Sequence, residues 1–488
     1  MLIQRIENTD YHYGETYRFY GWESADTVKP IKDCGYASLG EFYRGCLASW
    51  SIETCSVRFR PQWSEENPSV GQCTITAALV REYFGGELFG LPLIGGGTHS
   101  FNRLGGRFYD LACEQFGKNA LLDFDSALPV DAETLLSGGD KAERCERLRQ
   151  NLRAYAARPV VAIPLGDPAG IGPEIVIKAL GNQEITRIAK CLVVGDRRIV
   201  ERAMGFNNMP RLELNCVRSP EQGKYHEGVL NMIDLENLSP ADYTLGAVNA
   251  GCGKAAYEYI AKCIELAMEK KAAVVATPPI NKEALHAAEV PYIGHTEIFG
   301  ALTNTHDPLT IFEVRGMRIF FLTRHMSLRE ACDAVKKEKI VSYVRRMRET
   351  LDAMGVTGGS IAVAGLNPHC GEHGLFGTEE LDEVIPAVDE LQGLGYDVVG
   401  PIGADSVYHQ ALEGRFDAVL SLYHDQGHIA AKTVDFYHTI SLTAGMPILR
   451  TSVDHGTAYD LAGKGLANSV SMEEAIRVAA KYAEKTET

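Results

Sequence analysis

Short apolar runs recur through the last two thirds of the chain, and each is followed by residues typical of a loop or a helix start. They lie at residues 160–164, 190–194, 272–276, 317–322, 360–366 and 418–422. Runs of this length and composition are typical of buried parallel strands. Segments with helical character separate them at residues 173–180, 255–271 and 378–394. Repeated βα units predict an α/β domain with a mostly parallel, doubly wound sheet.

A domain boundary is predicted near residue 157. Residues 142–157 form a highly charged helical segment, and Arg158-Pro159 directly precede the first apolar run. Loop residues at 137–140 supply a helix cap before that segment. We therefore divide the chain into an accessory α+β domain, residues 1–157, and a larger domain, residues 158–488.

Composition limits the classes of partner. The chain has 488 residues and a net charge of −16, which argues against nucleic acid or an anionic membrane as a bulk partner. No apolar run reaches transmembrane length, and the first ten residues lack the apolar core of a signal peptide. The twelve cysteines include no Cys-x-x-Cys pair, which favours reduced thiols. We expect a cytoplasmic, soluble protein that binds a small molecule through a local cationic pocket.

Three histidines each follow one of the predicted strands. His325 lies in Leu-Thr-Arg-His-Met-Ser-Leu, His369 in Gly-Leu-Asn-Pro-His-Cys-Gly-Glu and His424 in Leu-Tyr-His-Asp-Gln-Gly-His. Ligands of open α/β sheets bind beyond the carboxyl ends of the strands. A single histidine at a strand end is more often a hydrogen-bonded loop residue. Three in consecutive units favour a divalent-cation site with coordination positions left open for substrate.

Further motifs stand in a fixed order along the same part of the chain. They are Gly-Asp-Pro-Ala-Gly-Ile-Gly-Pro-Glu at 166–174, Gly-His-Thr-Glu at 294–297, the segments 365–371 and 423–427, and Arg-Thr-Ser-Val-Asp-His-Gly-Thr at 450–457. With these motifs, the chain from about residue 159 onward resembles the 4-hydroxythreonine-4-phosphate dehydrogenase (PdxA) family. The resemblance covers roughly two thirds of the sequence.

The resemblance implies a fold and a chemistry. The fold would be an isocitrate/isopropylmalate dehydrogenase-like domain with two lobes and an active cleft between them. The reaction would be the metal-dependent, NAD- or NADP-dependent oxidation, with decarboxylation, of a phosphorylated four-carbon acid, as in pyridoxine biosynthesis. The family's metal ligands match His325, His369 and His424, and the ion would be Zn, Mg, Mn or Co. In the family this site lies at a homodimer interface, with one ligand from the partner subunit.

The family's substrate-binding positions also have counterparts here. They match His295 and Thr296, which we expect in a turn, and Lys432, Ser441 and Arg450. A lysine and an arginine suit the phosphate and carboxylate of such a substrate, because arginine can bind an anion through two parallel hydrogen bonds. An isolated Lys or Arg would ordinarily be a solvated surface charge.

A glycine-rich turn follows the first predicted strand. Gly166, Asp167, Gly170 and Gly172 precede a helix that opens at Pro173. Glycines allow positive φ and close backbone approach, and a helix N-terminus attracts anions, so the turn is a candidate anion- or cofactor-binding element. It resembles the Gly-Asp-Gly-Ile-Gly-Pro-Glu turn of isocitrate and isopropylmalate dehydrogenases and is no Rossmann fingerprint. Such turns also serve only to cross from strand to helix.

One position departs from the biosynthetic members of the family. They carry Asn nine residues before the arginine, where this chain has Ser441. A hydroxyl is shorter than an amide and offers a different set of donors and acceptors. The family has a second branch (PdxA2) that acts on D-threonate or D-erythronate 4-phosphate, and the Pro-Ile-Asn-Lys segment at 279–282 resembles that branch. We therefore expect a 2-hydroxy acid phosphate to be preferred over the 2-amino analogue.

The first 157 residues contain one further constellation. Gly-Gln-Cys at 71–73 opens a predicted helix at 74–84, and His99 and Asp110 fall on predicted strands, 98–104 and 106–112, joined by a Gly-Gly hairpin. A helix N-terminus lowers the pKa of a cysteine, so Cys73 with His99 and Asp110 is a candidate thiol site, and Gln72 a candidate oxyanion donor. This order resembles papain-like and transglutaminase-like folds, and Trp-Ser-Glu-Glu-Asn-Pro at 63–68 resembles small bacterial proteins of the YunG type. A buried structural cysteine or a docking module fits the same pattern.

Three functions remain open on the sequence. The first is a dehydrogenase fused to an accessory domain, which the intact set of His, Lys and Arg positions favours. The second is an N-terminal Cys-His-Asp hydrolase or amidase with a non-catalytic C-terminal metabolite-binding domain. The third is a non-catalytic sensor that binds phosphorylated metabolites.

Overall fold

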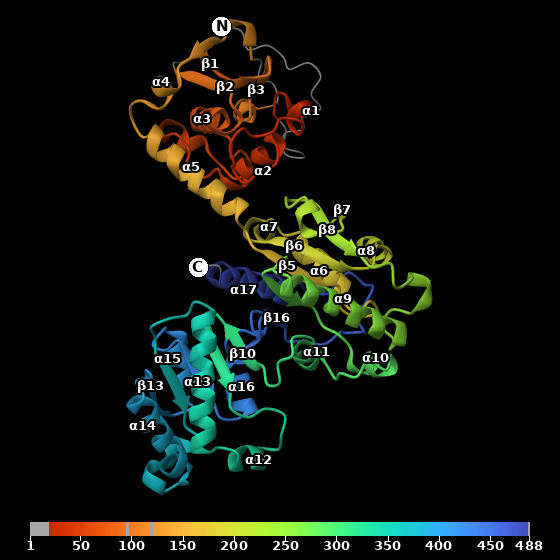
Figure 1. The fold of residues 1–488 in the computed structure, drawn as a ribbon, viewed down its shortest axis with the longest axis vertical. Coiled ribbons are helices and arrows are strands. Elements are labelled where there is room, and N and C mark those ends of the chain that lie inside the picture. The colour runs from red at the N-terminus through yellow and green to blue at the C-terminus, as the bar shows by residue number, and fades with distance from the viewer. Residues whose placement is uncertain (1–18, 94–96, 118–121, 487–488) are drawn as a thin grey trace. The chain divides into compact units, whose positions relative to one another are not determined.

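The computed structural model describes residues 19–93, 97–117 and 122–486, and it divides into two compact units, Met1–Arg158 and Pro159–Thr488 (Figure 1). We call these unit 1 and unit 2. No helix within the described ranges is both long enough and apolar enough to cross a bilayer. All twelve cysteines fall in these ranges, and each is a free thiol.

Unit 1 is a small α+β fold built on a four-stranded antiparallel sheet in the order β3-β2-β1-β4. Its strands are β1 (Glu87–Pro92), β2 (Thr98–Leu104), β3 (Arg107–Tyr109) and β4 (Leu128–Val130), and its longer helices are α2 (Leu39–Ser49), α3 (Cys73–Phe84) and α5 (Lys141–Ala156). The three helices pack on one another around a core rich in aromatic side chains, Tyr43 and Phe101 among them. Although α5 is highly charged, it buries Leu148 and Leu152 at helical spacing, so it docks on this core.

The hairpin predicted in unit 1 is present, but its second strand is short. Gly105 and Gly106 connect β2 to β3 with φ of 55° and 83°, as a two-residue hairpin turn requires. The prediction of a strand through residue 112 is wrong, because β3 ends at Tyr109. The Asp110 carboxylate accepts a hydrogen bond from the Ala112 backbone N–H, which turns the chain away, and Asp110 pairs only through an isolated bridge with Tyr20.

Unit 2 is a twelve-stranded sheet in the order β13-β12-β14-β11-β10-β15-β16-β9-β5-β6-β8-β7, with helices packed against it (Figure 1). The strands are β5 (Val160–Pro164), β6 (Lys190–Gly195), β7 (Glu213–Cys216), β8 (Val229–Asp234), β9 (Val274–Thr277), β10 (Leu309–Val314), β11 (Met317–Phe321), β12 (Ile361–Ala364), β13 (Val398–Ile402), β14 (Ala418–Ser421), β15 (Ile440–Ala444) and β16 (Leu449–Val453). The helices are α6 (Gly172–Leu180), α7 (Gln183–Ile188), α8 (Arg197–Met204), α9 (Ala250–Met268), α10 (Lys282–Ala287), α11 (His295–Leu302), α12 (Leu328–Asp333), α13 (Lys337–Ala353), α14 (Ile385–Gly393), α15 (Val407–Leu412), α16 (His424–Val434) and α17 (Val470–Thr486). The α/β class and the mostly parallel sheet are confirmed.

The middle of this sheet is antiparallel, which the sequence did not predict. Strand β10 is antiparallel to both β11 and β15, and β15 is antiparallel to β16, whereas both outer parts of the sheet are parallel. The strand direction therefore reverses across β10, β15 and β16. The carboxyl ends of the parallel strands in the two lobes consequently lie at opposite edges of the sheet.

Each lobe has a large hydrophobic core that includes part of α17. One core forms around β5, β6, β8 and β9 with α6 and α9, and another around β11, β12 and β14 with α13 and α14. Helix α17 belongs to both, because Met472 and Ile476 enter the first core while Val478 and Tyr482 enter the second. The lobes therefore share a helix as well as a sheet.

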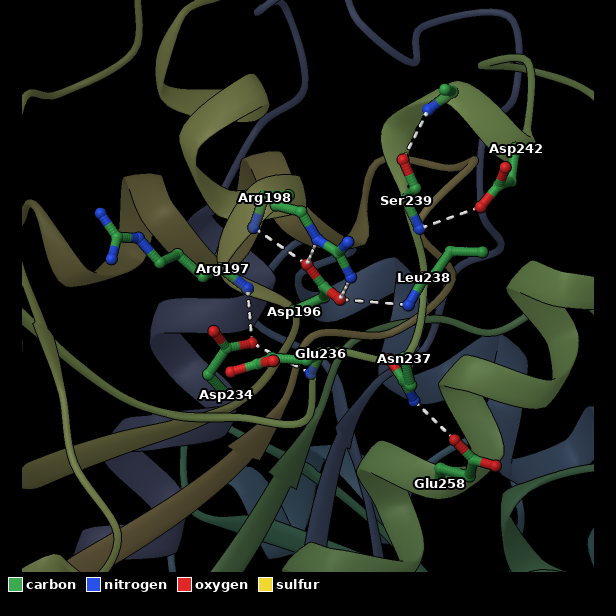
Figure 2. A network of polar contacts seen from close by, with 11 residues as sticks. Asp196, Arg197, Arg198, Asp234, Glu236, Asn237, Leu238, Ser239, Asp242 and Glu258 are labelled. Carbon is green, nitrogen blue, oxygen red and sulfur yellow. Dashed lines mark hydrogen bonds and ion pairs between the residues drawn. The ribbon is translucent and has the colours of Figure 1, made fainter.

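The carboxylate of Asp196 holds the loops after β6 and β8 together through hydrogen bonds (Figure 2). Asp196, buried at the N-terminus of α8, accepts hydrogen bonds from the backbone and guanidinium of Arg198 and from the Leu238 backbone N–H. The Asp234 carboxylate accepts from the backbone N–H groups of Arg197 and Glu236. These contacts fix the loop that follows β8 against α8.

Candidate functional site

The antiparallel middle of the unit 2 sheet carries a row of polar side chains on one face. Thr443 of β15 lies opposite Arg450 of β16, and Ser441 lies opposite Ser452, which in turn pairs with Thr277 of β9. Cross-strand partners project to the same face, and alternate residues of one strand share a face. Ser441, Thr443, Arg450 and Thr277 therefore share one side of the sheet.

Arg450 is held in a fixed orientation by two threonines. Its side chain is only 5% exposed; Nε donates to Thr277 Oγ1 at 2.9 Å and Nη1 donates to Thr443 Oγ1 at 2.9 Å. Neither of these two hydrogen bonds uses Nη2. Within the described part of the structure, the Nη2 edge of the guanidinium therefore remains available for a ligand. Burial lowers the pKa of Arg450, which means that its positive charge lacks full solvation. An anion bound here would supply that missing stabilisation.

His295 lies beside Arg450 and has an unsatisfied nitrogen. The prediction that His295 and Thr296 sit in a turn is wrong: they are the first two residues of α11, because Gly294 adopts an extended conformation at the N-cap. Burial, together with the positive charge of Arg450, lowers the pKa of His295 well below its ordinary value, so the ring is neutral. Its Nε2 atom is buried, with no hydrogen-bond partner among the described residues. An orphaned polar atom next to a buried cation points to a missing polar ligand.

Lys432 forms an ion pair. It lies in the last turn of α16, and its Nζ is 2.6 Å from Asp454 Oδ2 and 5.6 Å from the centre of the Phe436 ring. Asp454 directly follows β16, which carries Arg450. The lysine is thus tied to the strand that carries the arginine.

His325 and His424 lie together at the carboxyl ends of β11 and β14, which are parallel neighbours. Their ring centroids are 5.9 Å apart. His424 opens α16, and its Nδ1 lies 2.6 Å from Asp425 Oδ1, an arrangement that fixes the ring and leaves Nε2 for a ligand. Burial lowers the pKa of His325, which favours the neutral imidazole that a metal ion requires.

His369 follows β12, on the other side of β14, and projects from an unusual loop. The turn at Pro368–Gly374 contains six consecutive residues with positive φ, His369 (52°) to Gly374 (93°), although only Gly371 and Gly374 among them are glycines. Such a conformation is costly, and the buried Glu380 holds the loop by accepting hydrogen bonds from the backbone N–H groups of Leu366 and Asn367 at 2.7 Å. His369 is exposed. Within the described part of this single chain, no three His, Cys, Asp or Glu side chains form a group suited to a metal ion.

The glycine-rich turn is packed rather than open. Residues 166–172 are all buried, and a Cβ on Gly166, Gly170 or Gly172 would lie within 2.9 Å of a backbone oxygen. The Asp167 carboxylate accepts from the Ala169 backbone N–H and from the Tyr459 hydroxyl, the latter at 2.6 Å. These contacts explain the glycines by close packing, and the anion-binding role stays a prediction.

Two cavities lie beside α11 and His325. A cavity of about 380 Å³ is lined by Thr296, Glu297 and Arg324 among others, and a second of about 450 Å³ is lined by Arg324, His325 and Tyr343 among others. Arg324 lies between them. Space for a ligand therefore exists beside both α11 and His325.

In unit 1 the structure brings the predicted thiol residues together. Cys73 is the first residue of α3, and the interaction with His99 lowers the pKa of its thiol. His99 Nε2 lies 2.5 Å from Asp110 Oδ2.

Sequence reasoning missed the residues that hold these groups in place. Thr277 and Thr443 orient Arg450, and nothing in the sequence marks them. His428 stacks on His424 with ring centroids 3.6 Å apart, and its position four residues later on the same helix was a usable signal.

Unit 2 is thus a two-lobed α/β domain that carries a buried cation, Arg450, on the antiparallel middle of its sheet. The family model for the pyridoxal phosphate biosynthetic protein PdxA matches residues 187–479, and the chain therefore belongs to the PdxA family. A separate model, for the YunG protein, matches residues 38–157. Both resemblances seen in the sequence are confirmed.

Curated proteins and solved structures that resemble the chain support the same family. A Fusobacterium nucleatum protein with the provisional name D-threonate 4-phosphate dehydrogenase is 59% identical over 326 residues, which cover 67% of this chain and 98% of the relative. A Clostridium botulinum protein with the same provisional name is 56% identical over 328 residues, covering 67% and 98%. The crystal structure of 4-hydroxythreonine-4-phosphate dehydrogenase from Klebsiella pneumoniae is 39% identical, with a TM-score of 0.62, covering 67% of this chain and 99% of that one.

Proposed function

We propose that unit 2 is a metal- and NAD(P)-dependent dehydrogenase that oxidises and decarboxylates a phosphorylated four-carbon hydroxy acid, with D-threonate or D-erythronate 4-phosphate preferred over 4-hydroxythreonine 4-phosphate. The buried pair of Arg450 and His295 carries the proposal, because a desolvated cation beside an orphaned buried nitrogen fits an anionic, hydroxylated substrate. The names of relatives at 59% and 56% identity support the hydroxy-acid branch. Ser441 in place of the family's Asn supports the same choice.

Binding of the substrate would use three groups of the cleft. Nη2 of Arg450 offers a donor to the phosphate or carboxylate, and the neutral His295 ring offers its Nε2 atom to a hydroxyl. Lys432 would bind the other anionic group of the substrate, either by breaking its ion pair with Asp454 or while keeping it. Thr296 and Ser441 would supply shorter-range hydrogen bonds on either side. The orientation of the substrate is thus set before the reaction, which is where much of the rate enhancement of such enzymes originates.

The residues at the strand ends fit a divalent metal, Zn, Mg, Mn or Co. His325 and His424 present imidazoles from one subunit, and Asp425 fixes the ring of His424. We propose that the third ligand is His369 of the partner subunit, because the strained loop after β12 projects this exposed histidine without joining it to the other two in its own chain. When bound, the metal would polarise the substrate hydroxyl and the nicotinamide would accept hydride. The cavity beside His325 offers space next to that hydroxyl.

An absorbance assay for NADH or NADPH tests the proposal. The full chain would be given D-threonate, D-erythronate or 4-hydroxythreonine 4-phosphate, with and without a chelator. We expect reduction of the cofactor with at least one of these substrates and its loss on chelation. Substrate binding without cofactor reduction would instead establish the metabolite sensor. The alternative of an inactive unit 2 beside an N-terminal hydrolase receives no support from the relatives, which are named dehydrogenases.

A further inference from the structure

Unit 1 contains a nucleophile that the proposed dehydrogenase does not use. Cys73 occupies the first position of α3 and is half-buried. The N-cap residue, Gln72, makes no side-chain cap to this helix. The first-turn backbone N–H groups of α3 therefore gain no capping side chain from Gln72, and the helix begins at the residue that carries the sulfur. Such groups carry partial positive charge.

His99 connects the thiol to a carboxylate. It is fully buried on β2, its Nε2 lies 2.5 Å from Asp110 Oδ2, and its interaction with Cys73 shifts the pKa of both groups. Nε2 is engaged by Asp110, so Nδ1 is the nitrogen that would take the thiol proton, and doing so would release the hydrogen bond that it accepts from Gln115. Nδ1 faces Gln115 Nε2 at 3.2 Å, and Gln115 itself donates to the Ala112 backbone oxygen at 2.9 Å. Asp110 is fixed in turn by the Ala112 N–H.

The surroundings of Cys73 differ from those of the neighbouring cysteines. Burial opposes ionisation of Cys73, yet the contact with His99 outweighs it and lowers the pKa to about 7. Burial raises the pKa of Cys55 to about 11 and that of Cys113 well above its ordinary value. The ion pair with Asp110 raises the pKa of His99 to about 10, in spite of its burial. Cys73 and His99 are thus suited to exist as a thiolate and an imidazolium.

A polar group close to the nucleophile lacks a partner. Gln72 is fully buried, and its Nε2 donates to the Ser51 backbone oxygen at 3.1 Å. Its Oε1 has no hydrogen-bond partner among the described residues, although the atom is buried. This acceptor adjoins Cys73, so a ligand bearing an N–H group would satisfy it.

We infer that unit 1 holds a second catalytic site, in which Cys73, His99 and Asp110 cleave the amide bond of a carboxamide substrate by acyl transfer. The Cys73 sulfur bonds to the acyl carbon as the C–N bond breaks, and the proton on His99 Nδ1 passes to the departing amine. Water then attacks the thioester, its proton returns to His99, and the acid leaves Cys73. Backbone N–H groups at the start of α3 face the developing oxyanion. The imidazolium supplies the proton that an amine leaving group requires.

The reactivity of the thiol is tested on the full chain by iodoacetamide labelling followed by peptide mass analysis. We expect Cys73 to be labelled first among the twelve cysteines, with half-maximal rate near pH 7. His99→Gln and Asp110→Asn should slow labelling at pH 7 by about tenfold and move the profile to higher pH. Cys55→Ser is the matched control, because it removes a nearby buried thiol and should leave the profile unchanged. The wild-type profile needs no variant to fold, and an ordinary alkaline thiol profile for Cys73 would overturn the inference.

Acyl transfer is tested with p-nitrophenyl acetate and a fluorogenic N-acyl anilide. Wild type and Cys55→Ser should form an acetyl thioester on Cys73 and release the aniline, whereas Cys73→Ser should do neither. Cys73→Ser should keep full dehydrogenase activity, so the thiol site and the dehydrogenase are judged separately. If Cys73 is reactive but never acylated, or if Cys73→Ser retains anilide cleavage, the assignment is wrong.

Discussion

His424 stacks on His428, with ring centroids 3.6 Å apart and ring planes inclined by only 12°. His428 in turn packs on Phe312 at 4.1 Å, and its Nδ1 lies 2.8 Å from the His424 backbone oxygen. Burial lowers the pKa of His428 to about 4, so the ring is neutral at physiological pH. The neutral His428 ring, which packs on Phe312, therefore holds the proposed metal ligand His424 in place without adding a positive charge beside it.

This stack predicts the effect of changing His428. His428→Ala should weaken metal binding by about tenfold, because His424 loses the surface that orients it. His428→Phe keeps an aromatic ring and should retain most of the affinity. Metal content after dialysis against graded chelator, measured by atomic emission, provides the readout. Equal metal loss in both variants would mean that the imidazole itself is needed.

The proposed sharing of the metal between subunits predicts complementation. His325→Ala, His369→Ala and His424→Ala should each be inactive alone. Unfolding and refolding a mixture of His325→Ala with His369→Ala should restore activity to about a quarter of wild type, since half of the dimers would be mixed and each would carry one complete site. A mixture of His325→Ala with His424→Ala should stay inactive, because both ligands come from the same subunit. Recovery in both mixtures, or in neither, would contradict this arrangement.

Loss of the buried cation should affect the substrate specifically. Arg450→Ala should lower kcat/KM by about ten- to a hundredfold, because the charge-assisted contact to the anion is lost. Arg450→Lys should recover only part, since a lysine cannot reproduce the orientation set by Thr277 and Thr443. Arg345→Ala, at an exposed position on α13, serves as the control. An unchanged kcat/KM in Arg450→Ala would show that the anion binds elsewhere.

Substrate choice should depend on residue 441. Wild type should prefer D-threonate or D-erythronate 4-phosphate over 4-hydroxythreonine 4-phosphate. Ser441→Asn should move the ratio of kcat/KM toward the amino substrate by about tenfold, because an amide adds an acceptor with longer reach. Ser441→Ala should weaken both without changing the ratio. A wild-type preference for the amino acid would refute the assignment to the hydroxy-acid branch.

The acid that closes the loop after β8 should contribute to stability in a pH-dependent way. Burial alone would raise the pKa of Asp196, but hydrogen bonds from Arg198 and Leu238 lower it below its ordinary value. Its contribution is therefore complete above the pKa of an unfolded aspartate, about 4, and is lost as pH falls toward the lower folded value. Asp196→Asn should lower the free energy of unfolding by about 1–3 kcal/mol at pH 7, with a smaller difference below pH 4. Asp352→Asn, which removes an ion pair between an exposed carboxylate and Arg348, should cost less than about 1 kcal/mol in the same urea titration.

The parts of unit 2 that could be predicted are those with a local signal. Strand β5 matches the predicted range because an apolar run buried on both faces has few other conformations. The segment predicted as one helix at 378–394 instead begins with a π-helical turn at Glu380–Val384 before α14, because Glu380 points inward to hold the loop of His369. The strands that carry Ser441 and Arg450 mix polar and apolar residues, so no run marked them. Their pairing also joins segments more than a hundred residues apart, because β15 is antiparallel to β10 and β16 is parallel to β9.

In the candidate sites, too, the residues with a local sequence signal could be predicted and the others could not. Histidines after strands and a cysteine at a helix start have sequence signatures, and the structure places His325 next to His424 and Cys73 next to His99. The orientation of Arg450 depends on two threonines from different strands, which only the completed sheet brings together. The left-handed loop that carries His369 is likewise held by Glu380, which lies outside that loop.

Helix α17 limits how the two lobes of unit 2 can move. One of its sides is packed in the first core and the other in the second, through Ile476 and Tyr482 among others. Wide separation of the lobes would expose one of those packed sides to water. We therefore expect the two lobes to move by a small rotation about an axis near α17, because close-packed interfaces tolerate small sliding far better than separation. In such a rotation Arg450, on β16 beside α17, would move least. The metal ligands at the distant strand ends would move farthest.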